Sequence, residues 1–351
     1  MCVVPAGAPA PAPGRPRIDV APGHSSTAST FRLIRWPRCR RRGRSIGGLG
    51  RSRNPTGAHN HRRRAVMDTR TIESYDLKYD GEHLIEVPGG AELYYELRGQ
   101  GPQLTIINNF FIISPLWRNF TTRLVTRNRI LTYDLRNQGA SSAAETQLKF
   151  ESHVEDLAHL LDALDIERTY LVGTSTSTLI CRDFALAHPE RVKGLIMVGP
   201  IFCPYGSRRR KYLTQSWLNT LASGGVKALF AHIYPLVYSD RTIENGGSPA
   251  YLALRERFLA LNSYEQVHQN LSASLTSDDD PKKLERIVCP TLLLAGEADF
   301  LTCPSSLAAA CRLLPAGGMQ ILDFSGHIPY FEATAAFEAA VQSFIDAAER
   351  R

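Results

Sequence analysis

Three residues that lie far apart in the sequence carry the side chains that nucleophilic acyl transfer needs. Ser175 and Asp299 each follow a short apolar run and a glycine, and His327 lies in a loop after another apolar run. A serine hydroxyl becomes a nucleophile when a histidine takes its proton and a carboxylate orients that histidine. Taken singly, the three residues are explained as a helix cap, a turn aspartate and a loop histidine. Their order along the chain favours a catalytic triad.

The segment around Ser175 has the composition of a sharp turn between a strand and a helix. Residues 171–177 are Leu-Val-Gly-Thr-Ser-Thr-Ser, so small side chains flank Ser175. Such a turn presents the hydroxyl above the sheet, beside a helix N-terminus that stabilises developing negative charge. The usual pattern is Gly-x-Ser-x-Gly, and Ser177 stands where the second glycine is expected.

An acyl-transfer site also needs backbone N–H donors for the oxyanion that forms in the transition state. Thr176, the residue after the nucleophile, is expected to supply one donor. The second is expected from the loop after the apolar run 104–107, and Phe110 is the predicted residue. Asn108 and Asn109 precede it, and their side-chain amides are candidates for contact with a polar substrate.

The chain around these residues alternates between apolar runs and helical stretches. This alternation predicts an α/β fold in which a mostly parallel sheet is covered by helices on both faces. The predicted strands are 84–87 and 92–97, which form a hairpin, and then 104–107, 129–133, 169–172, 192–198, 291–294 and 319–322; the predicted helices are 150–164, a helix from the Ser175 turn to about residue 188, and 334–348.

Between the sixth and seventh predicted strands the alternation stops, and residues 201–286 are mainly helical in pattern. This insertion is placed where a lid over the site would lie. Trp217, Phe230 and Tyr234 within it are predicted to line an apolar substrate pocket. The arginine run 208–210 at its start is interpreted as a solvated face or as a docking point for an acidic carrier.

The first 66 residues differ in composition from the rest of the chain. The protein has 351 residues and a net charge of +7, but residues 1–66 hold 14 Arg, no Lys, one Asp and no Glu, which is +13. Subtracting 13 from 7 leaves −6 for residues 67–351, which argues against nucleic-acid binding. We interpret the leader as disordered or as the product of an upstream start codon, with Met67 as the true first residue. An organelle transit peptide and a nucleic-acid-binding tail are the alternatives.

The remaining bulk features indicate a cytoplasmic domain over residues 67–351. No apolar run is long enough for a membrane span, which needs about 18 to 20 residues. The seven cysteines are odd in number and scattered, without the paired spacing of a zinc site. Reduced thiols in a cytosolic protein are the simpler interpretation. Triad chemistry needs neither a metal nor an organic cofactor.

Residues 78–345 resemble the α/β-hydrolase superfamily. Residues 131–142 are similar to its Asp-x-Arg-Gly-x-Gly-x-Ser segment, and 187–192 resemble the stretch that follows its nucleophile helix. Residues 296–299 and 326–327 resemble its acid and histidine loops. The resemblance implies the α/β-hydrolase fold with a helical lid, and a serine hydrolase activity.

Two departures from that family pattern indicate a specialised subgroup. Asn108 and Asn109 replace the usual His-Gly before the oxyanion residue, and Ser177 replaces a glycine. The helical insertion is similar in layout to that of acyltransferases that join hydroxyacyl chains carried on acyl carrier protein. It is also similar to that of hydrolases from polyketide and other natural-product pathways. This likeness implies a thioester as the substrate.

These features predict a hydrolase that cleaves an ester or thioester of an apolar acyl or polyketide-like substrate through an acyl-Ser175 intermediate. The expected partner is a small acyl molecule, which an acyl carrier protein could present. Two alternatives stay open. The acyl group could pass to a hydroxyl acceptor instead of water, or the chain could be a non-catalytic ligand-binding descendant of the fold.

Overall fold

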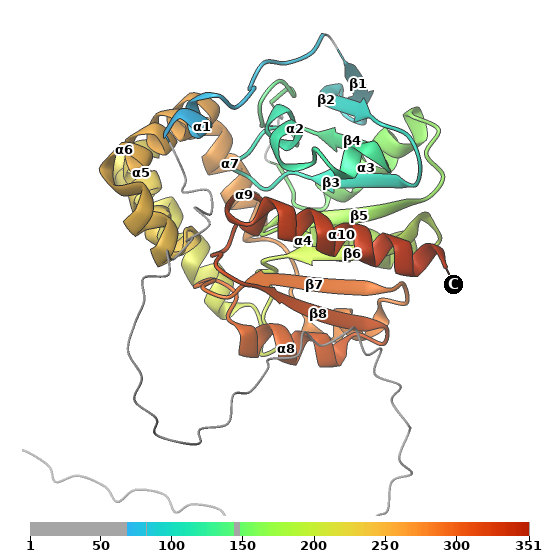
Figure 1. Cartoon of the computed structure of the whole chain (residues 1–351). Helices are drawn as coiled ribbons and strands as arrows, with labels where there is room; N and C mark the ends of the chain where they lie inside the picture. Colours follow the sequence, from blue (N-terminus) through green and yellow to red (C-terminus); the bar gives the residue numbers. More distant parts are fainter. Residues whose placement is uncertain (1–68, 82, 144–147, 351) are drawn as a thin grey trace, which may run out of the picture. The chain divides into compact units, whose positions relative to one another are not determined.

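The sheet that carries the predicted site residues is seen in a computed structural model that describes residues 69–81, 83–143 and 148–350. The Arg-rich segment 1–66 and the proposed start at Met67 lie outside the described residues. The strands are β1 (Leu84–Val87), β2 (Ala91–Arg98), β3 (Gln103–Ile107), β4 (Arg129–Tyr133), β5 (Thr169–Thr174), β6 (Val192–Val198), β7 (Thr291–Gly296) and β8 (Gly317–Leu322) (Figure 1).

The described strands form one eight-stranded sheet in the order β1-β2-β4-β3-β5-β6-β7-β8. β1 and β2 pair antiparallel, as do β2 and β4, and all the other neighbours are parallel. Every residue of β3, β5 and β7 is buried, as expected for parallel strands covered on both faces. The predicted α/β class and its mostly parallel sheet are confirmed.

The strand order reverses direction between β3 and β5. From β3 the chain goes outward to β4, returns to form β5 on the other side of β3, and then proceeds through β6 to β8. Loops at the carboxyl ends of strands separate at such a reversal, which makes it the usual ligand site of an open parallel sheet. The loops that follow β3 and β5 therefore meet where the sequence places its predicted oxyanion donors.

Two glycines show how closely helices cover opposite faces of the sheet. A Cβ on Gly173 of β5 would lie 2.6 Å from the Sγ of Cys181. A Cβ on Gly194 of β6 would lie 2.9 Å from the ring of Phe344, which packs edge-on against Tyr170. Tyr170 pairs with Gly194 and is three residues from Gly173, so the two glycines face opposite ways. The helices on the two faces include α4 (Ser177–Ala187), which carries Cys181, and α10 (Thr334–Glu349), which carries Phe344.

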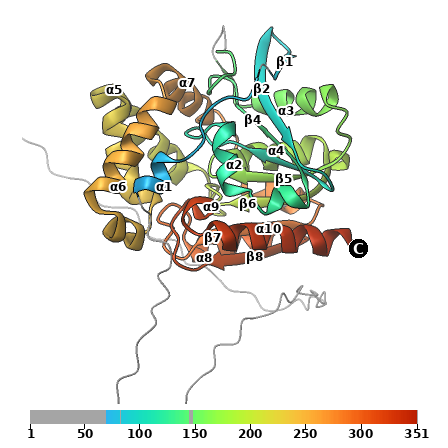
Figure 2. The same ribbon diagram turned by 45° about the horizontal axis from the view of Figure 1, so that its top comes forward.

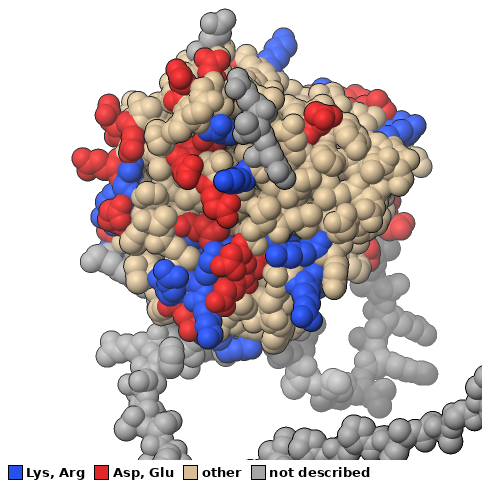
Figure 3. All heavy atoms as spheres, turned by 180° about the vertical axis from the view of Figure 1, so that it is seen from behind, with Lys and Arg blue, Asp and Glu red and all other residues tan. Residues whose placement is uncertain are grey.

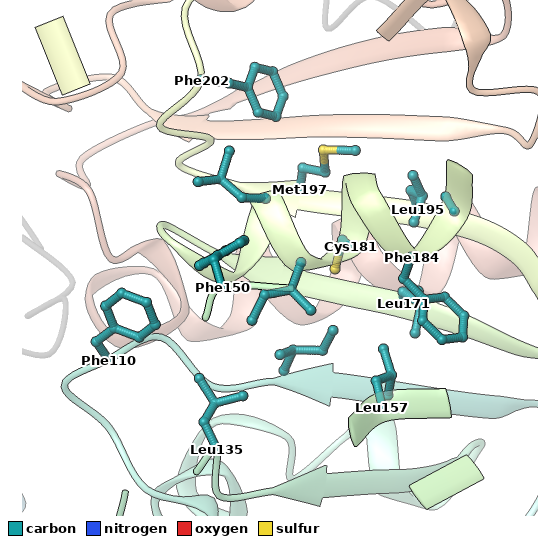
Figure 4. Close-up of a cluster of buried hydrophobic side chains, with 14 of the residues drawn as sticks. Phe110, Leu135, Phe150, Leu157, Leu171, Cys181, Phe184, Leu195, Met197 and Phe202 are labelled. Atoms are coloured by element: carbon teal, nitrogen blue, oxygen red, sulfur yellow. The ribbon is translucent and has the colours of Figure 1, made fainter. Parts of the chain in front are cut away.

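A buried apolar cluster joins the sheet to α4 and to α3 (Ser152–Ala163). Figure 4 shows Leu171, Leu195 and Met197 from the strands packed toward Phe184 of α4 and Leu157 of α3. The apolar residues of α3 recur at helical spacing, which is why one face of this helix is buried. The remaining helices of the sheet region are α2 (Trp117–Phe120), α8 (Pro304–Leu313) and α9 (Pro329–Glu332), with short 3-10 turns at Ser114–Leu116, Leu124–Thr126, Pro189–Arg191 and Pro281–Arg286. The short helix α1 (Thr69–Glu73) packs instead against α6 (Asp240–Leu261).

Three helices lie between β6 and β7 in the chain, and we call them the helical insertion: α5 (Arg208–Val237), α6 (Asp240–Leu261) and α7 (Tyr264–Ser274). They stand beside the sheet, near the ends of its strands (Figures 1 and 2). α5 is broken at Gly225, where φ is 69°, and α6 is broken at Gly247, where φ is 54°. A left-handed φ suits glycine, so each break falls on a residue that permits it.

Neither a metal-binding cluster nor a membrane-spanning helix is found among the described residues. No group of three or more His, Cys, Asp and Glu side chains in this part of the chain is arranged to hold a metal ion. No described helix combines the length and the apolar character that a membrane crossing needs. On the face shown in Figure 3, acidic and basic side chains are intermixed.

Candidate active site

Ser175 lies on a tight turn between β5 and α4 with a φ of 55°, which is unusual for a residue other than glycine. Its N–H donates to the carbonyl of Val198 at 2.8 Å, which anchors the turn to β6. The close approach of Gly173 to Cys181 allows α4 to begin directly after the strand. Backbone strain of this kind costs about 1–3 kcal/mol and is typical of functional sites.

Ser177 explains how the turn forms without the second glycine of the usual pattern. Its side chain is buried, and its Oγ accepts from the N–H of Thr174 at 2.7 Å. The same hydroxyl lies 2.9 Å from the carbonyl of Ile107 and donates toward it. Ser177 therefore links the turn to the end of β3, which no glycine could do.

His327 reaches Ser175 from the loop after β8. Its Nε2 is 2.8 Å from the Oγ of Ser175, and its side chain is almost fully buried. The backbone N–H of His327 donates to the carbonyl of Val237 at 2.8 Å, so the end of α5 holds this loop. Gly199 leaves room for the imidazole, because a Cβ there would lie 2.8 Å from the ring.

Asp299 completes the arrangement from the loop after β7. Its Oδ2 and Oδ1 lie 3.0 Å and 3.1 Å from the Nδ1 of His327. The N–H groups of Leu301 and Thr302 each donate to Oδ1 at 2.8 Å, which fixes the carboxylate. An Nδ1–H that donates to Asp299 leaves Nε2 free to accept the serine proton. The structure thus brings together the three residues predicted as the triad.

Glu332 in α9 is a supporting residue that the sequence analysis did not identify. One carboxylate oxygen accepts from the N–H of Gly326 at 2.6 Å, next to His327. The other accepts from the N–H and the hydroxyl of Ser239 at 2.9 Å and 2.7 Å. Glu332 therefore joins the histidine loop to the start of α6. Its partners are 6 and 93 residues away, so no local sequence pattern marks this role.

Asn108, a predicted substrate contact, is committed to an internal network. Its Nδ2 donates to the carboxylate of Asp134 at 3.0 Å and to the Oε1 of Gln138 at 3.1 Å. Its Oδ1 accepts from the indole N–H of Trp117 at 2.8 Å. Asn108 is fully buried and does not line the cavity that contains Ser175. The interpretation of its side chain as a substrate contact is therefore not supported.

Asn109 is used in the same way. Its Oδ1 accepts from the N–H of Phe111 at 2.9 Å, and its Nδ2 donates to Tyr330 at 3.1 Å and to Thr174 at 3.3 Å. The Asn109 carbonyl accepts from the Nε2 of Gln138 at 2.6 Å. Both asparagines therefore shape the loop after β3, and neither is among the described residues that line the cavity beside Ser175.

The predicted oxyanion donors flank the strand reversal. Phe110 follows β3 and Thr176 follows β5, and these two strands are parallel neighbours. Among the described residues, neither backbone N–H donates a hydrogen bond within the protein. Both groups thus keep their hydrogens for another acceptor, as oxyanion donors must.

Asp134 follows β4 and organises the loops beneath the site. Its carboxylate accepts from the N–H groups of Ser114 and Ala140 at 2.7 Å and 3.0 Å, and from the hydroxyl of Tyr79 at 2.8 Å. Burial raises the pKa of Asp134 to about 6, against the lowering effect of these hydrogen bonds. Asp134 therefore has a structural role in these loops.

A small cavity of about 30 Å³ opens beside Ser175, with room for about two water molecules. One face of α5 forms part of its wall, because Arg210, Leu213, Thr214 and Trp217 follow one another at helical spacing. The other described lining residues are Ser175, Thr176, Pro200, Ile201, Phe202, Cys203, Arg209, Leu301, Thr302 and Ser306.

The three aromatic residues predicted to line the pocket lie in two different places. Trp217 lines this cavity, next to Phe111. Phe230 and Tyr234 do not line it, and pack instead in a separate apolar cluster with Ile72 of α1 and with residues of α6. The break in α5 at Gly225 lies between Trp217 and Phe230, so the helical spacing is not continuous from one residue to the other.

The arginine run at the start of the insertion is not a uniform solvated face. Arg208 and Arg209 are exposed, but Arg210 is only 4% exposed. Arg209 and Arg210 both line the cavity with Ser175. The helical spacing from Arg210 to Trp217 is the sequence signal that could have placed both in one wall.

Residues 88–334 match the family model described as the alpha/beta hydrolase fold. The protein therefore belongs to the α/β-hydrolase family, as the sequence resemblance implied. Its relatives include proteins named as a carbamate hydrolase and an enol-lactonase, and the class of enzyme is an α/β-fold hydrolase.

Similar proteins include a Caulobacter protein named "Putative carbamate hydrolase RutD", 28% identical over 260 residues that cover 72% of this chain and 95% of that one. The polyketide synthase ThaQ of Burkholderia thailandensis is 24% identical over 272 residues, which is 75% of this chain and 13% of ThaQ. The structure of a thermophilic esterase from Thermogutta terrifontis aligns with a TM-score of 0.68 and 23% identity, covering 76% of this chain and 97% of the esterase.

Proposed function

We propose that this protein is a serine hydrolase that cleaves a carboxylic ester or thioester through an acyl-Ser175 intermediate. The observation that carries the proposal is the hydrogen-bonded chain from the Oγ of Ser175 through His327 to Asp299. Each contact is within the 2.6–3.2 Å reach that proton transfer requires. The left-handed backbone at Ser175 supports the same role.

The proposed reaction has two halves. The Oγ of Ser175 attacks the carbonyl carbon of the substrate, and its proton moves to the Nε2 of His327. The bond to the alcohol or thiol then breaks, and that leaving group takes the proton from His327. Water gives a proton to His327 and attacks the acyl carbon, the bond to Ser175 breaks, and Ser175 regains its proton as the acid leaves. Asp299 holds the imidazole and stabilises its charged form throughout.

The oxyanion of each tetrahedral intermediate would be bound by the N–H groups of Thr176 and Phe110. Their lack of partners among the described residues supports this assignment. Each such donor is worth about 2.7–4 kcal/mol of transition-state stabilisation. The first turn of α4, directly after Thr176, adds its partial positive charge.

We propose that residues 201–286, which contain the helical insertion, act as a lid over the site, because α5 forms one wall of the cavity. Apolar residues such as Ile201, Phe202 and Leu213 favour an acyl group there, and the small volume favours a short one. A longer acyl or polyketide-like substrate would require the insertion to move. The match to a polyketide synthase supports testing a thioester alongside an ester.

Intact-mass analysis after exposure to a fluorophosphonate tests the proposal. We expect one adduct on the wild type and on the control Ser223→Ala, which alters an exposed serine of α5, and none on Ser175→Ala. Hydrolysis of 4-nitrophenyl acetate or S-acetyl-N-acetylcysteamine should fall by about 10⁴-fold or more in Ser175→Ala. A folded wild type that takes no adduct would contradict the acyl-enzyme mechanism and favour a binding protein.

A further inference from the structure

The cavity wall contributed by α5 contains buried hydrogen-bond donors that have no acceptor. The Nη2 of Arg210 and the Nε1 of Trp217 make no hydrogen bond to any described residue. Arg210 is 4% exposed and Trp217 is 5% exposed, and both line the cavity with Ser175. An unpaired buried donor costs about 1–3 kcal/mol, more when it is charged. Two of them in one small wall indicate that an acceptor binds there.

The rest of the Arg210 guanidinium is held rigidly. Its Nε donates to the carboxylate of Asp279 at 2.6 Å, and its Nη1 donates to the carbonyl of Ser274 at 2.7 Å. The carboxylate of Asp279 also forms an ion pair with Arg182 of α4, at 3.4 Å, so two arginines contact one buried carboxylate. Arg182 also donates two hydrogen bonds to the carboxylate of Asp183, so each arginine has a carboxylate partner. Asp279 fixes the position of Arg210.

The charge around the cavity is one-sided. Arg209 and Arg210 are both in its wall, and none of the described lining residues is Asp or Glu. Both arginines belong to the first turn of α5, where the helix dipole adds partial positive charge. An anionic group in the cavity would meet no Asp or Glu among the described lining residues. Arg210 is paired with Asp279, and Arg209 donates to the carbonyls of Leu301 and Phe300.

Donor number and volume indicate the kind of anion. The Nη2 of Arg210 offers two N–H groups and the indole of Trp217 offers one, which suits the two oxygens of a carboxylate. A cavity of about 30 Å³ accommodates the carboxylate group alone, so the rest of the ester would require the helical insertion to move. Because Ser175 lines the same cavity, the anion and the scissile carbonyl would belong to one molecule.

We propose that the substrate is a monoester or monothioester of a dicarboxylic acid, whose free carboxylate binds to Arg210 and Trp217 while its acyl carbonyl faces Ser175. This inference rests on the proposed hydrolase function and names its substrate class. Arg210 and Trp217 are the specificity-determining residues, and Arg209 contributes through its charge.

Binding to the Ser175→Ala variant tests the proposal without requiring catalysis. The probes are monomethyl glutarate, monomethyl adipate and monomethyl suberate, each compared by calorimetry with the neutral methyl ester of the same chain length, such as methyl hexanoate for adipate. We expect at least one charged ester to bind about tenfold or more tightly than its neutral partner, as for a charge-assisted hydrogen bond.

Second substitutions in the same background assign the effect to residues. Arg210→Gln should remove the preference for the charged ester, and Trp217→Phe, which keeps the ring and removes its N–H, should reduce it severalfold. Because Arg210 also pairs with buried Asp279, Trp217→Phe gives a readout that does not disturb that pair. Arg208→Gln is the control, since it removes an adjacent exposed charge outside the cavity wall and should leave the preference intact.

Two results would overturn the inference: equal binding of charged and neutral esters at all three lengths, or equal weakening of both kinds of ester by Arg210→Gln and by Trp217→Phe. Fluorophosphonate labelling of Ser175 reports separately on the hydrolase proposal. Labelling without a charge preference therefore refutes only the substrate class, and a charge preference without labelling refutes only the hydrolase.

Discussion

The two walls of the candidate active site differ in how completely their polar groups are paired. On the sheet side, every polar side-chain atom of Asn108, Asn109 and Ser177 has a hydrogen-bond partner. On the insertion side, Arg210 and Trp217 each keep a buried donor without a partner among the described residues. The network behind the turn of Ser175 is thus saturated, whereas the cavity itself is lined by groups unpaired within the described part of the chain, the two donors of α5 and the Oγ1 of Thr176.

This difference separates two tasks of an enzyme site. Groups whose hydrogen bonds are all made fix the backbone, so the oxyanion donors and Ser175 can be held in the accurate positions that catalysis needs. Unpaired buried donors lower the stability of the ligand-free protein, and this penalty is removed only when an acceptor binds to them. The sheet wall is therefore expected to set the reaction, and the insertion wall is expected to set the substrate.

The largest expected effect comes from changing a charge inside the saturated wall. In Asp299→Asn, the amide oxygen can still accept from Leu301 and Thr302, but the amide nitrogen faces the Nδ1 of His327. His327 then carries its proton on Nε2 and cannot accept one from Ser175. We expect kcat to fall by about 10⁴-fold, with little change in the urea midpoint.

Asp323→Asn, at an exposed position outside the cavity, is the matched control and should retain full activity. If Asp299→Asn kept more than a tenth of the wild-type kcat, the tautomer argument would be wrong.

Asn108→Ala should show that the saturated wall stabilises the fold. The change leaves the indole N–H of Trp117, the carboxylate of Asp134 and the amide of Gln138 each short of one partner. At about 1–3 kcal/mol for each buried unpaired group, we expect the free energy of unfolding to fall by about 3–5 kcal/mol. Urea denaturation measures this change. Asn219→Ala, on the exposed side of α5, should cost less than about 0.5 kcal/mol, and a similar small loss for Asn108→Ala would contradict the network's role.

The strands and the triad could be predicted from the sequence because their signals are local. Apolar runs mark buried strands, and Ser175, Asp299 and His327 each follow one. The roles of Arg210 and Asn108 depend on partners far along the chain, since Asp279 is 69 residues from Arg210 and Asp134 is 26 residues from Asn108. No local pattern contains such a pairing.

The division of the predicted pocket aromatics has a different physical cause. Trp217 and Phe230 fall on opposite sides of the break in α5, where Gly225 adopts a φ of 69°. A helical pattern predicts which residues share a face only as far as the helix is continuous. Gly224 and Gly225 are visible in the sequence, but the direction that the chain takes after them depends on packing of α5 against α6 and α7.

His153 departs from the saturation of the sheet wall and allows the smallest of these effects to be measured. Its ring packs between Phe110, at 6.2 Å, and Phe150, at 5.8 Å between ring centroids. The side chain is fully buried, and neither ring nitrogen has a partner among the described residues. Burial, followed by the charge of Arg136, lowers the pKa of His153 to about 3.

Because the pKa of His153 is lower in the folded than in the unfolded protein, the unfolded state binds the extra proton as pH falls below about 6.5. The stability that this group contributes is present above that pH and is lost on acidification. Between pH 7 and 4.5, we expect the free energy of unfolding measured in urea to fall by about 2 kcal/mol more for wild type than for His153→Leu.

Asp134, whose raised pKa favours the folded state on acidification, is present in both proteins and cancels in the difference. His159→Leu, at an exposed histidine of α3, should follow wild type. Parallel curves for wild type and His153→Leu would mean that His153 has a hydrogen-bond partner or access to water, and that the sheet wall is saturated there as well.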